Sequence, residues 1–166
     1  MLAEDGASQI NGLISSKDSD GTGGSIQILG KDILLDNRCI LDCSGQNGGG
    51  EIYIGGNFSL ANPLLLRALS TTVASKAFIK NDAILRNNGG KTVVWSQEKT
   101  DFSGSISARG GRINGNGGLT GVCSEKDLQL TGNIDISANN GKKGLCITDF
   151  HVLVFNEPFL YLKMLV

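Results

Sequence analysis

The chain of 166 residues is long enough for one domain with a hydrophobic core of its own. It contains 24 glycines but 2 prolines, and 40% of its residues are apolar, which excludes a collagen-like repeat and intrinsic disorder. The formal net charge of -1 gives no clustered positive charge for nucleic acid or an anionic membrane, so neither is expected as a partner.

The N-terminal sequence, residues 1–11, is polar and lacks both the basic and the apolar regions of a signal peptide. If the protein is exported, we therefore expect this sequence to be an internal piece or a truncated copy of a longer one.

Glycine pairs divide the rest of the chain into similar units. Each pair is followed by a short run with alternating polarity and β-branched residues, which predicts a β-strand. The predicted strands cover residues 25–28, 51–54, 91–95 and 119–122, and a shorter copy after Gly144 covers residues 145–147.

A second predicted strand precedes each glycine cluster. Its first residue is apolar in every copy and should face the interior, its second is mostly Ser or Asp and should face solvent, and its third is mostly small. In the unit from Gly89 to Gly118 we expect Val93, Val94, Ile106 and Ala108 to line the interior. The five copies begin at Ile14, Leu41, Ile84, Ile106 and Ile134, and the copy at Ile84 is the least regular because Leu85 and Arg86 follow.

The opening glycines recur at similar spacing except between Gly49 and Gly89, where the gap is larger. This gap should hold either an extra coil or an excursion from the repeat. Within it, residues 62–69 could form one or two helical turns, because their apolar residues are contiguous and Pro63 suits a helix start.

A unit of two or three short strands cannot bury its own apolar face, whereas stacked units can. We therefore predict an all-β fold, a right-handed parallel β-helix (β-solenoid) with stacked coils and glycine-rich corners. An antiparallel sandwich is the structural alternative, but the Asn-Gly pairs lie inside long corners and not in tight hairpins. Residues 1–150 should form a single domain. The hydrophobic tail, residues 151–166, lacks the recurring glycine pairs. It either caps the open end of the solenoid or is non-native read-through.

Two stretches, GGKTVVWSQEKTDFSGSISARGGRINGNGG (89–118) and GNIDISANNGKKG (132–144), resemble the repeat region of filamentous-haemagglutinin-type exoproteins. These are large bacterial adhesins exported by two-partner secretion, and the resemblance covers about residues 10–150. It implies a parallel β-helix, a secreted or surface-tethered location, and an adhesive role without catalysis. For the full-length protein it also implies an outer-membrane transporter and a host-cell glycan or protein receptor as partners.

The sequence departs from that family in three ways. No counterpart of the export domain at the start of such proteins is evident, family members usually avoid cysteine whereas this chain has 4, and the tail replaces an expected Leu-rich strand. Cys39, Cys43, Cys123 and Cys146 show no C-x-x-C pair and no neighbouring His, so we expect buried small side chains and no zinc site.

No catalytic, cofactor-binding or metal-binding residue is predicted. Asp42 and Asp135 share a column but should lie several coils apart, farther than the ~5 to 9.5 Å that paired catalytic carboxylates need. The loop at Asp18 lacks the remaining ligands of a calcium site, and His151 has no matching nucleophile. Trp95 is expected to pack in a coil, and Arg109 to be a solvated charge in a turn.

Two alternative functions stay open. Parallel β-helices also include carbohydrate-active lyases and hydrolases, which would make this chain an enzyme. The chain could also be a degenerate gene remnant without a function of its own, whose open solenoid ends would self-associate.

Overall fold

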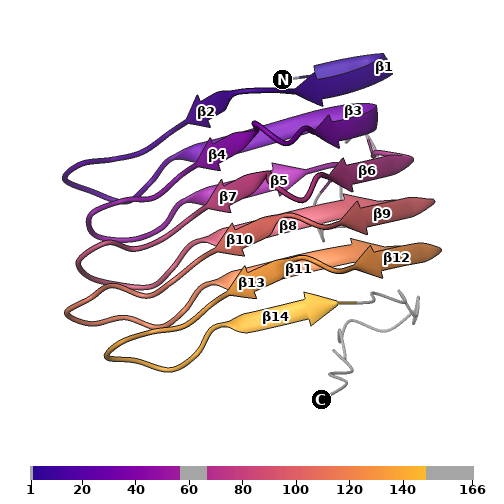
Figure 1. Ribbon diagram of the computed structural model, residues 1–166. Helices are drawn as coiled ribbons and strands as arrows, with labels where there is room; N and C mark the ends of the chain where they lie inside the picture. The colour runs from indigo at the N-terminus through magenta and orange to yellow at the C-terminus, as the bar shows by residue number, and fades with distance from the viewer. Residues whose placement is uncertain (1, 57–66, 149–166) are drawn as a thin grey trace, which may run out of the picture.

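The computed structural model describes residues 2–56 and 67–148, and these residues form stacked β-strands (Figure 1). Their bounds are β1 (Leu2–Ile10), β2 (Leu13–Ser15), β3 (Ser25–Leu35), β4 (Ile40–Asp42), β5 (Glu51–Ile54), β6 (Ser70–Val73), β7 (Phe78–Lys80), β8 (Lys91–Ser96), β9 (Lys99–Phe102), β10 (Ser105–Ser107), β11 (Leu119–Ser124), β12 (Asp127–Leu130), β13 (Asn133–Asp135) and β14 (Leu145–Thr148).

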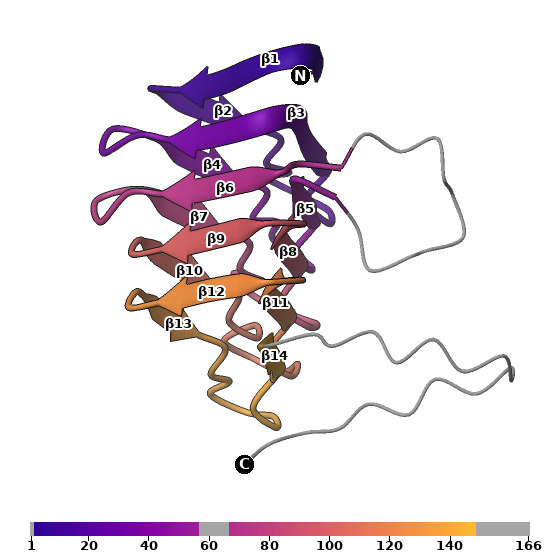
Figure 2. The same cartoon turned by 90° about the vertical axis from the view of Figure 1, so that its right-hand side faces the viewer.

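The strands build three walls of a solenoid. Wall 1 contains the first half of β3, β5, β8, β11 and β14; wall 2 contains β1, the second half of β3, β6, β9 and β12; wall 3 contains β2, β4, β7, β10 and β13. Every pair of neighbouring strands is parallel. The predicted parallel β-helix is confirmed, with about five coils and no helix among the described residues. Figures 1 and 2 show the coils stacked from β1 at the top to β14 at the bottom.

The predicted strands after the glycine pairs are confirmed. Each strand of wall 1 begins directly after a glycine: Ser25, Glu51, Lys91, Leu119 and Leu145 are the first residues of β3, β5, β8, β11 and β14. Wall 1 is thus the part of the solenoid that local sequence specifies most directly.

Close packing of the coils explains the glycine pairs. A Cβ on Gly118 would overlap the carbonyl oxygen of Gly90, and a Cβ on Gly90 would overlap the Asn81 side chain and the carbonyl oxygen of Gly50. Neither glycine has a positive φ, so at these positions glycine is required by the close approach of neighbouring coils.

Columns of apolar side chains fill the interior. In wall 3 the register places Leu41, Ile79, Ile106 and Ile134 above one another, and the first three are 0%, 0% and 1% exposed.

Buried hydroxyl groups donate hydrogen bonds to backbone carbonyls at the corner between walls 1 and 2. Thr71 donates to the carbonyl of Trp95 at 3.0 Å, and Thr100 donates to the carbonyl of Cys123 at 2.8 Å.

One predicted strand was wrong. The wall 3 strand between β4 and β10 is β7, and its inward residue is Ile79. Ile84, the predicted inward residue, is 49% exposed in the corner that follows, where its N–H donates to the carbonyl of Gly45. Ile84 also begins an apolar run before a glycine pair, but it is too close to that pair to leave room for the corner.

Three further expectations concern the large gap and the tail, and of the two alternatives for the gap, an extra coil or an excursion, the strand pairing agrees with the excursion. The large gap between Gly49 and Gly89 adds no coil: residues 55–69 connect β5 to β6, where two residues, Gln97 and Glu98, connect β8 to β9. Most of the helix expected over residues 62–69 falls in the undescribed range 57–66, and the described residues 67–69 are not helical. The tail 151–166 also lies outside the described residues.

Candidate functional site

A cluster of charged and hydroxyl side chains lies outside wall 3 and at the corner that follows it. We call Asp82, Ser107, Arg109 and Asp135 the Asp82 cluster. Ser107 and Asp135 are the last residues of β10 and β13, while Arg109 and Asp82 each lie two residues beyond the end of β10 and β7. Because the coils are in register, residues at similar distances from these strand ends come together.

Asp82 is the acceptor at the centre of the cluster. Its Oδ1 accepts hydrogen bonds from the Ser107 hydroxyl at 2.7 Å and from the Arg109 backbone N–H at 2.7 Å. Its Oδ2 accepts from Arg109 Nη2 at 2.8 Å and Nε at 3.3 Å. Arg109 Nε also lies 4.0 Å from Asp135 Oδ2, so one guanidinium joins carboxylates of two other coils. Asp82 is 9% exposed, whereas the Arg109 side chain is 55% exposed.

The electrostatics of the cluster favour the charged forms. Hydrogen bonding to Asp82, followed by the charges of Asp82 and Asp135, raises the pKa of Arg109. Hydrogen bonding to Ser137, with smaller contributions from the Arg109 and Lys143 charges, lowers the pKa of Asp135. A general acid needs a raised carboxyl pKa, so the shift at Asp135 has the wrong direction for that role. The arrangement acts as an ion pair that ties coils together.

Replacing Asp82 by Ala is expected to lower the free energy of unfolding by about 1–3 kcal/mol, because it leaves the Arg109 backbone N–H and the Ser107 hydroxyl without their acceptor. Asp135→Asn, at a side chain that is 41% exposed, should cost less than about 1 kcal/mol. Urea denaturation followed by circular dichroism measures both. Equal losses for the two variants would contradict the central role of Asp82.

Asp42 and Asp135 share a column in the structure. The residues between them are Lys80 and Ser107, because β7 and not residues 84–87 provides the intervening strand. Three coil steps of about 4.8 Å separate the two carboxylates by roughly 14 Å, beyond the spacing of a catalytic pair. The expected solvent exposure of this column was wrong for Asp42, which is 7% exposed, and for Ser107, which is 6% exposed. Corner residues cover them: Asp42 accepts from the Ser44 N–H at 3.0 Å, and Ser107 contacts Asp82.

The Asp18 loop forms a polar corner. Asp18 Oδ1 accepts hydrogen bonds from the N–H groups of Asp20 at 2.8 Å and Gly21 at 2.7 Å, and these bonds lower its pKa. No group of three or more metal-ligating side chains occurs within the described ranges. His151 lies outside them.

Three of the four cysteines are buried, as predicted. Burial, followed by the charges of Asp36 and Asp42 respectively, raises the pKa of Cys39 and Cys43 to about 11, so both stay protonated at neutral pH. Cys123 is 0% exposed. The prediction was wrong for Cys146, which is exposed because it lies in the last described strand and no described strand packs beyond it.

A second apolar cluster lies on the outer face of wall 1. It contains Val93, Trp95 and Cys123, with Tyr53 and Ile147 packed against it. Trp95 is 6% exposed, so the prediction that it packs is confirmed, but it packs on the outer face and not inside the coil. The Arg67 guanidinium lies 5.7 Å from its ring centroid. The expected inward position of Val93 was wrong, because Val94 alternates with it and belongs to the interior cluster.

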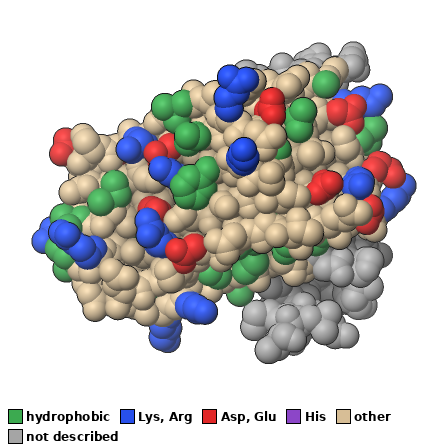
Figure 3. All heavy atoms as spheres, viewed as in Figure 1, with side chains coloured by type: hydrophobic (Ala, Val, Ile, Leu, Met, Phe, Trp, Pro, Cys, Tyr) green, Lys and Arg blue, Asp and Glu red, His purple; other side chains and the backbone are tan. Residues whose placement is uncertain are grey.

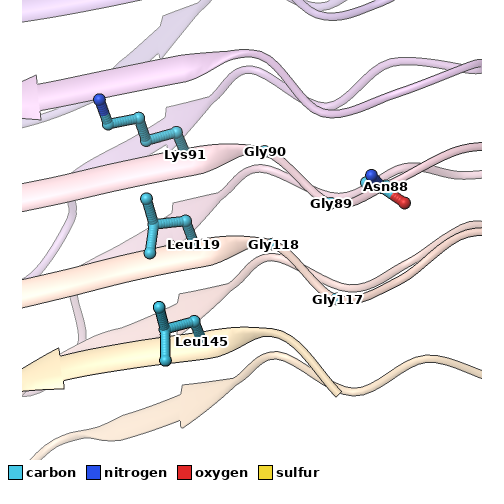
Figure 4. Close-up of a pocket in the computed structure, with 8 residues that line it drawn as sticks. All are labelled: Asn88, Gly89, Gly90, Lys91, Gly117, Gly118, Leu119 and Leu145. Atoms are coloured by element: carbon cyan, nitrogen blue, oxygen red, sulfur yellow. The ribbon is translucent and has the colours of Figure 1, made fainter. Parts of the chain in front are cut away.

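A shallow groove of about 360 Å³ runs along the glycine corner of wall 1. Figure 4 shows its lining side chains: Lys91, Leu119 and Leu145 stand above one another beside the glycine pairs. Glycines expose the backbone here, so the groove offers peptide groups and one apolar row but no cluster of acids or nucleophiles.

Sequence reasoning missed the Asp82 cluster. The wall 3 strand in this coil was predicted to begin at Ile84, five residues after its true inward residue, Ile79. With the strand misplaced, the sequence did not align Asp82 with Ser107 and Arg109. The number of residues between the inward isoleucine and the next glycine pair is the signal that could have located the strand. Ile79 and Ile106 lie ten and eleven residues before Gly89 and Gly117, whereas Ile84 lies five before Gly89.

The fold is similar to that of a solved structure, the HMW1 secretion domain from Haemophilus influenzae, with a TM-score of 0.71 and 24% sequence identity. The match covers 87% of this chain and 38% of that chain, so this chain spans less than half the length of the structure that it matches. No protein-family model and no curated protein matches the sequence. At this identity the similarity concerns the fold alone.

Proposed function

We propose that this chain is a non-catalytic β-helical segment of a secreted bacterial adhesin of the filamentous-haemagglutinin type. The observation that carries the proposal is the in-register stack of about five coils, which is similar in fold to part of a solved secretion domain. The sequence resemblance over about residues 10–150 supports the same assignment.

The surface supports a scaffolding role. The face drawn in Figure 3 carries dispersed positive and negative side chains with isolated apolar ones between them. The Asp82 cluster directs its hydrogen bonds within the protein, as a structural ion pair does. The described residues include no helix long and apolar enough to cross a membrane. In the proposed role the solenoid is a rod that holds an adhesive surface away from the cell.

The proposal assigns partners to the full-length protein. An outer-membrane transporter of the two-partner type exports it, and a host-cell glycan or protein is its receptor. Deleting the transporter gene in the source bacterium should remove this sequence from the culture medium and the cell surface, as detected with antibodies against the purified chain. Unchanged surface signal in the deletion strain would overturn the export route.

Adhesion is tested with beads coated with the purified chain and incubated with host epithelial cells. Beads coated with the folded chain should be retained on the cells in larger number than beads coated, at the same density, with the Ile106→Asp variant, which is expected to be unfolded.

Incubation with polyuronides and host glycans separates the adhesin from a carbohydrate-active enzyme. New reducing ends or unsaturated products that a heat-treated sample does not yield would refute the non-catalytic role.

A further inference from the structure

At the two ends of the described solenoid, strand edges have no partner among the described residues. We call the outer edges of β12, β13 and β14 the lower edge, and those of β1, β2 and the first half of β3 the upper edge. In the described part of the chain no strand pairs with either edge. Figure 2 shows these strands at opposite ends of the stack. Unpaired edges present rows of N–H and C=O groups that can pair with another strand.

The interior columns become exposed at the lower edge. In wall 2, Leu35, Val73 and Phe102 are each 0% exposed, but Leu130, the next residue of that column, is 38% exposed. In wall 3 the buried column ends at Ile134, which is half-buried, and in wall 1 it ends at Cys146, which is exposed. The lower edge therefore leaves the apolar interior open in walls 2 and 3, while in wall 1 the exposed Cys146 ends a column whose nearest members are Thr120 and Thr92.

We propose that the lower edge of one copy of this chain pairs with the upper edge of a second copy, so that the solenoids stack head to tail. The coil order supports this partner. The upper edge consists, in chain order, of strands in walls 2, 3 and 1, and the lower edge consists of strands in the same walls in the same order. A second copy placed below thus puts β1 under β12, β2 under β13, and the first half of β3 under β14.

Extending the observed register across the seam places an apolar side chain of the second copy under the last residue of one interior column in each wall. Asp32, Ser70, Lys99 and Asp127 share the column of Ala7, which places Ile10 of the second copy under Leu130. The same extension places Ile14 under Ile134 in wall 3 and Ile26 under Cys146 in wall 1. Each of these three columns continues with an apolar side chain of the second copy, whereas the second interior columns of walls 2 and 1 place Ser8 under Leu128 and Ile28 under Thr148. A shift by one residue would turn every inward side chain outward, so this register is specified.

Charge also favours this orientation. Lys142 and Lys143 lie in the lowest described corner, just before Gly144. In the stack they lie over the uppermost corner of the second copy, which precedes Gly23 and is net acidic because it contains Asp18 and Asp20 beside Lys17. Stacking two lower edges would instead place the lysines of both copies in one interface. Opposite charges at the two ends thus select head-to-tail contact over contact between like ends.

Head-to-tail contact is not closed by symmetry, so each added copy exposes a new edge. The expected result for the purified full chain is a weight-average mass that rises with concentration beyond that of a dimer, measured by sedimentation. Leu130→Lys should weaken association at least about tenfold, because it would bury an ammonium group against Ile10 of the next copy. Gln129→Lys adds the same charge to the same strand on its exposed outward face and should change association by less than about twofold.

Disulfide cross-linking tests the register. Directly stacked residues of parallel strands lie about 4.8 Å apart, within the Cα separation that a disulfide spans. Ile26→Cys should therefore give a ladder of dimers, trimers and higher species with Cys146 under oxidation. Ser25→Cys, on the opposite face of wall 1, should not.

Three outcomes would overturn the proposal. They are a monomer at every concentration, as expected if this chain's own residues beyond Thr148 occupy the lower edge; a mass that stops at the dimer; and equal cross-linking of the Ile26 and Ser25 variants. Thermal melts show whether each variant is folded before these comparisons are made. Self-association of the isolated chain is also expected of a degenerate remnant, so these outcomes test the pairing of the two edges and leave adhesion to the bead assay.

Discussion

Ile106→Asp is expected to lower the free energy of unfolding by more than about 4 kcal/mol or to prevent folding, because it buries a carboxylate without a partner. Ile106 is 1% exposed and lies between Ile79 and Ile134 in the interior column of wall 3. No described cation shares that column. Thermal and urea denaturation followed by circular dichroism measure the loss.

Ser107→Ala is the matched control, since Ser107 follows Ile106 in β10 but faces away from the interior. It loses one hydrogen bond to Asp82 and should cost about 1 kcal/mol. If Ile106→Asp does not fold, Ile106→Ala gives a measurable substitute with an expected cost of about 2–5 kcal/mol. Equal losses for the Ile106 and Ser107 variants would contradict the assignment of inward and outward faces.

Gly118→Ala is expected to cost about 3 kcal/mol or more, because the added Cβ would overlap backbone atoms of Gly89 and Gly90 in the coil above. The overlapping atoms belong to the backbone of a strand start and its corner, so no side-chain rotation relieves the contact. The midpoint of urea denaturation should fall without a change in its slope.

Gly6→Ala provides the control for the Gly118 variant. No atom lies within 4 Å of a Cβ built on Gly6, and its φ is not positive, so the substitution should change stability by less than about 1 kcal/mol. A Gly118 variant as stable as the Gly6 variant would show that the coils can separate at the glycine corner, and would refute close packing as the reason for the glycine pairs.

Local sequence predicted wall 1 well because its signals are adjacent in the chain. A glycine that touches the neighbouring coil is followed at once by the strand, so the start of β8 at Lys91 follows directly from Gly89 and Gly90. The glycine pairs gave no information about the length of the connection that follows each wall 1 strand. The connection between β5 and β6 was correctly recognised as unusual, but whether it formed a coil or an excursion depended on pairing between β3 and β6.

Wall 3 was harder to predict because its strands are three residues long and its corners vary. Ile84 and Ile79 are both apolar residues ahead of the same glycine pair, and pairing with Leu41 and Ile106 shows that Ile79 is the strand residue. Alternation also failed to identify the interior in β8, where Val93 and Val94 are both 0% exposed. Val93 is buried on the outer face, and a strand that is buried on both faces carries no alternating signal.

The Asp82 cluster was not predicted because its members come from three coils, and aligning them requires the correct position of each wall 3 strand. Asp82, Ser107 and Asp135 lie more than twenty residues apart in sequence, and each is an ordinary polar residue at the end of a strand. The register brings them around Arg109, whose expected role as a solvated turn charge was correct only for its exposed side.

The sequence by itself determined the class of fold, since repeated glycine pairs with short apolar runs specify stacked coils, and it determined where the strands of wall 1 begin. The tertiary structure decided which isoleucine enters wall 3, which valine faces outward, and which acid holds Arg109. The physical reason is that corners and strand starts depend on neighbouring residues in the chain. A column or an ion pair depends instead on the register between coils, which a one-residue shift would change throughout.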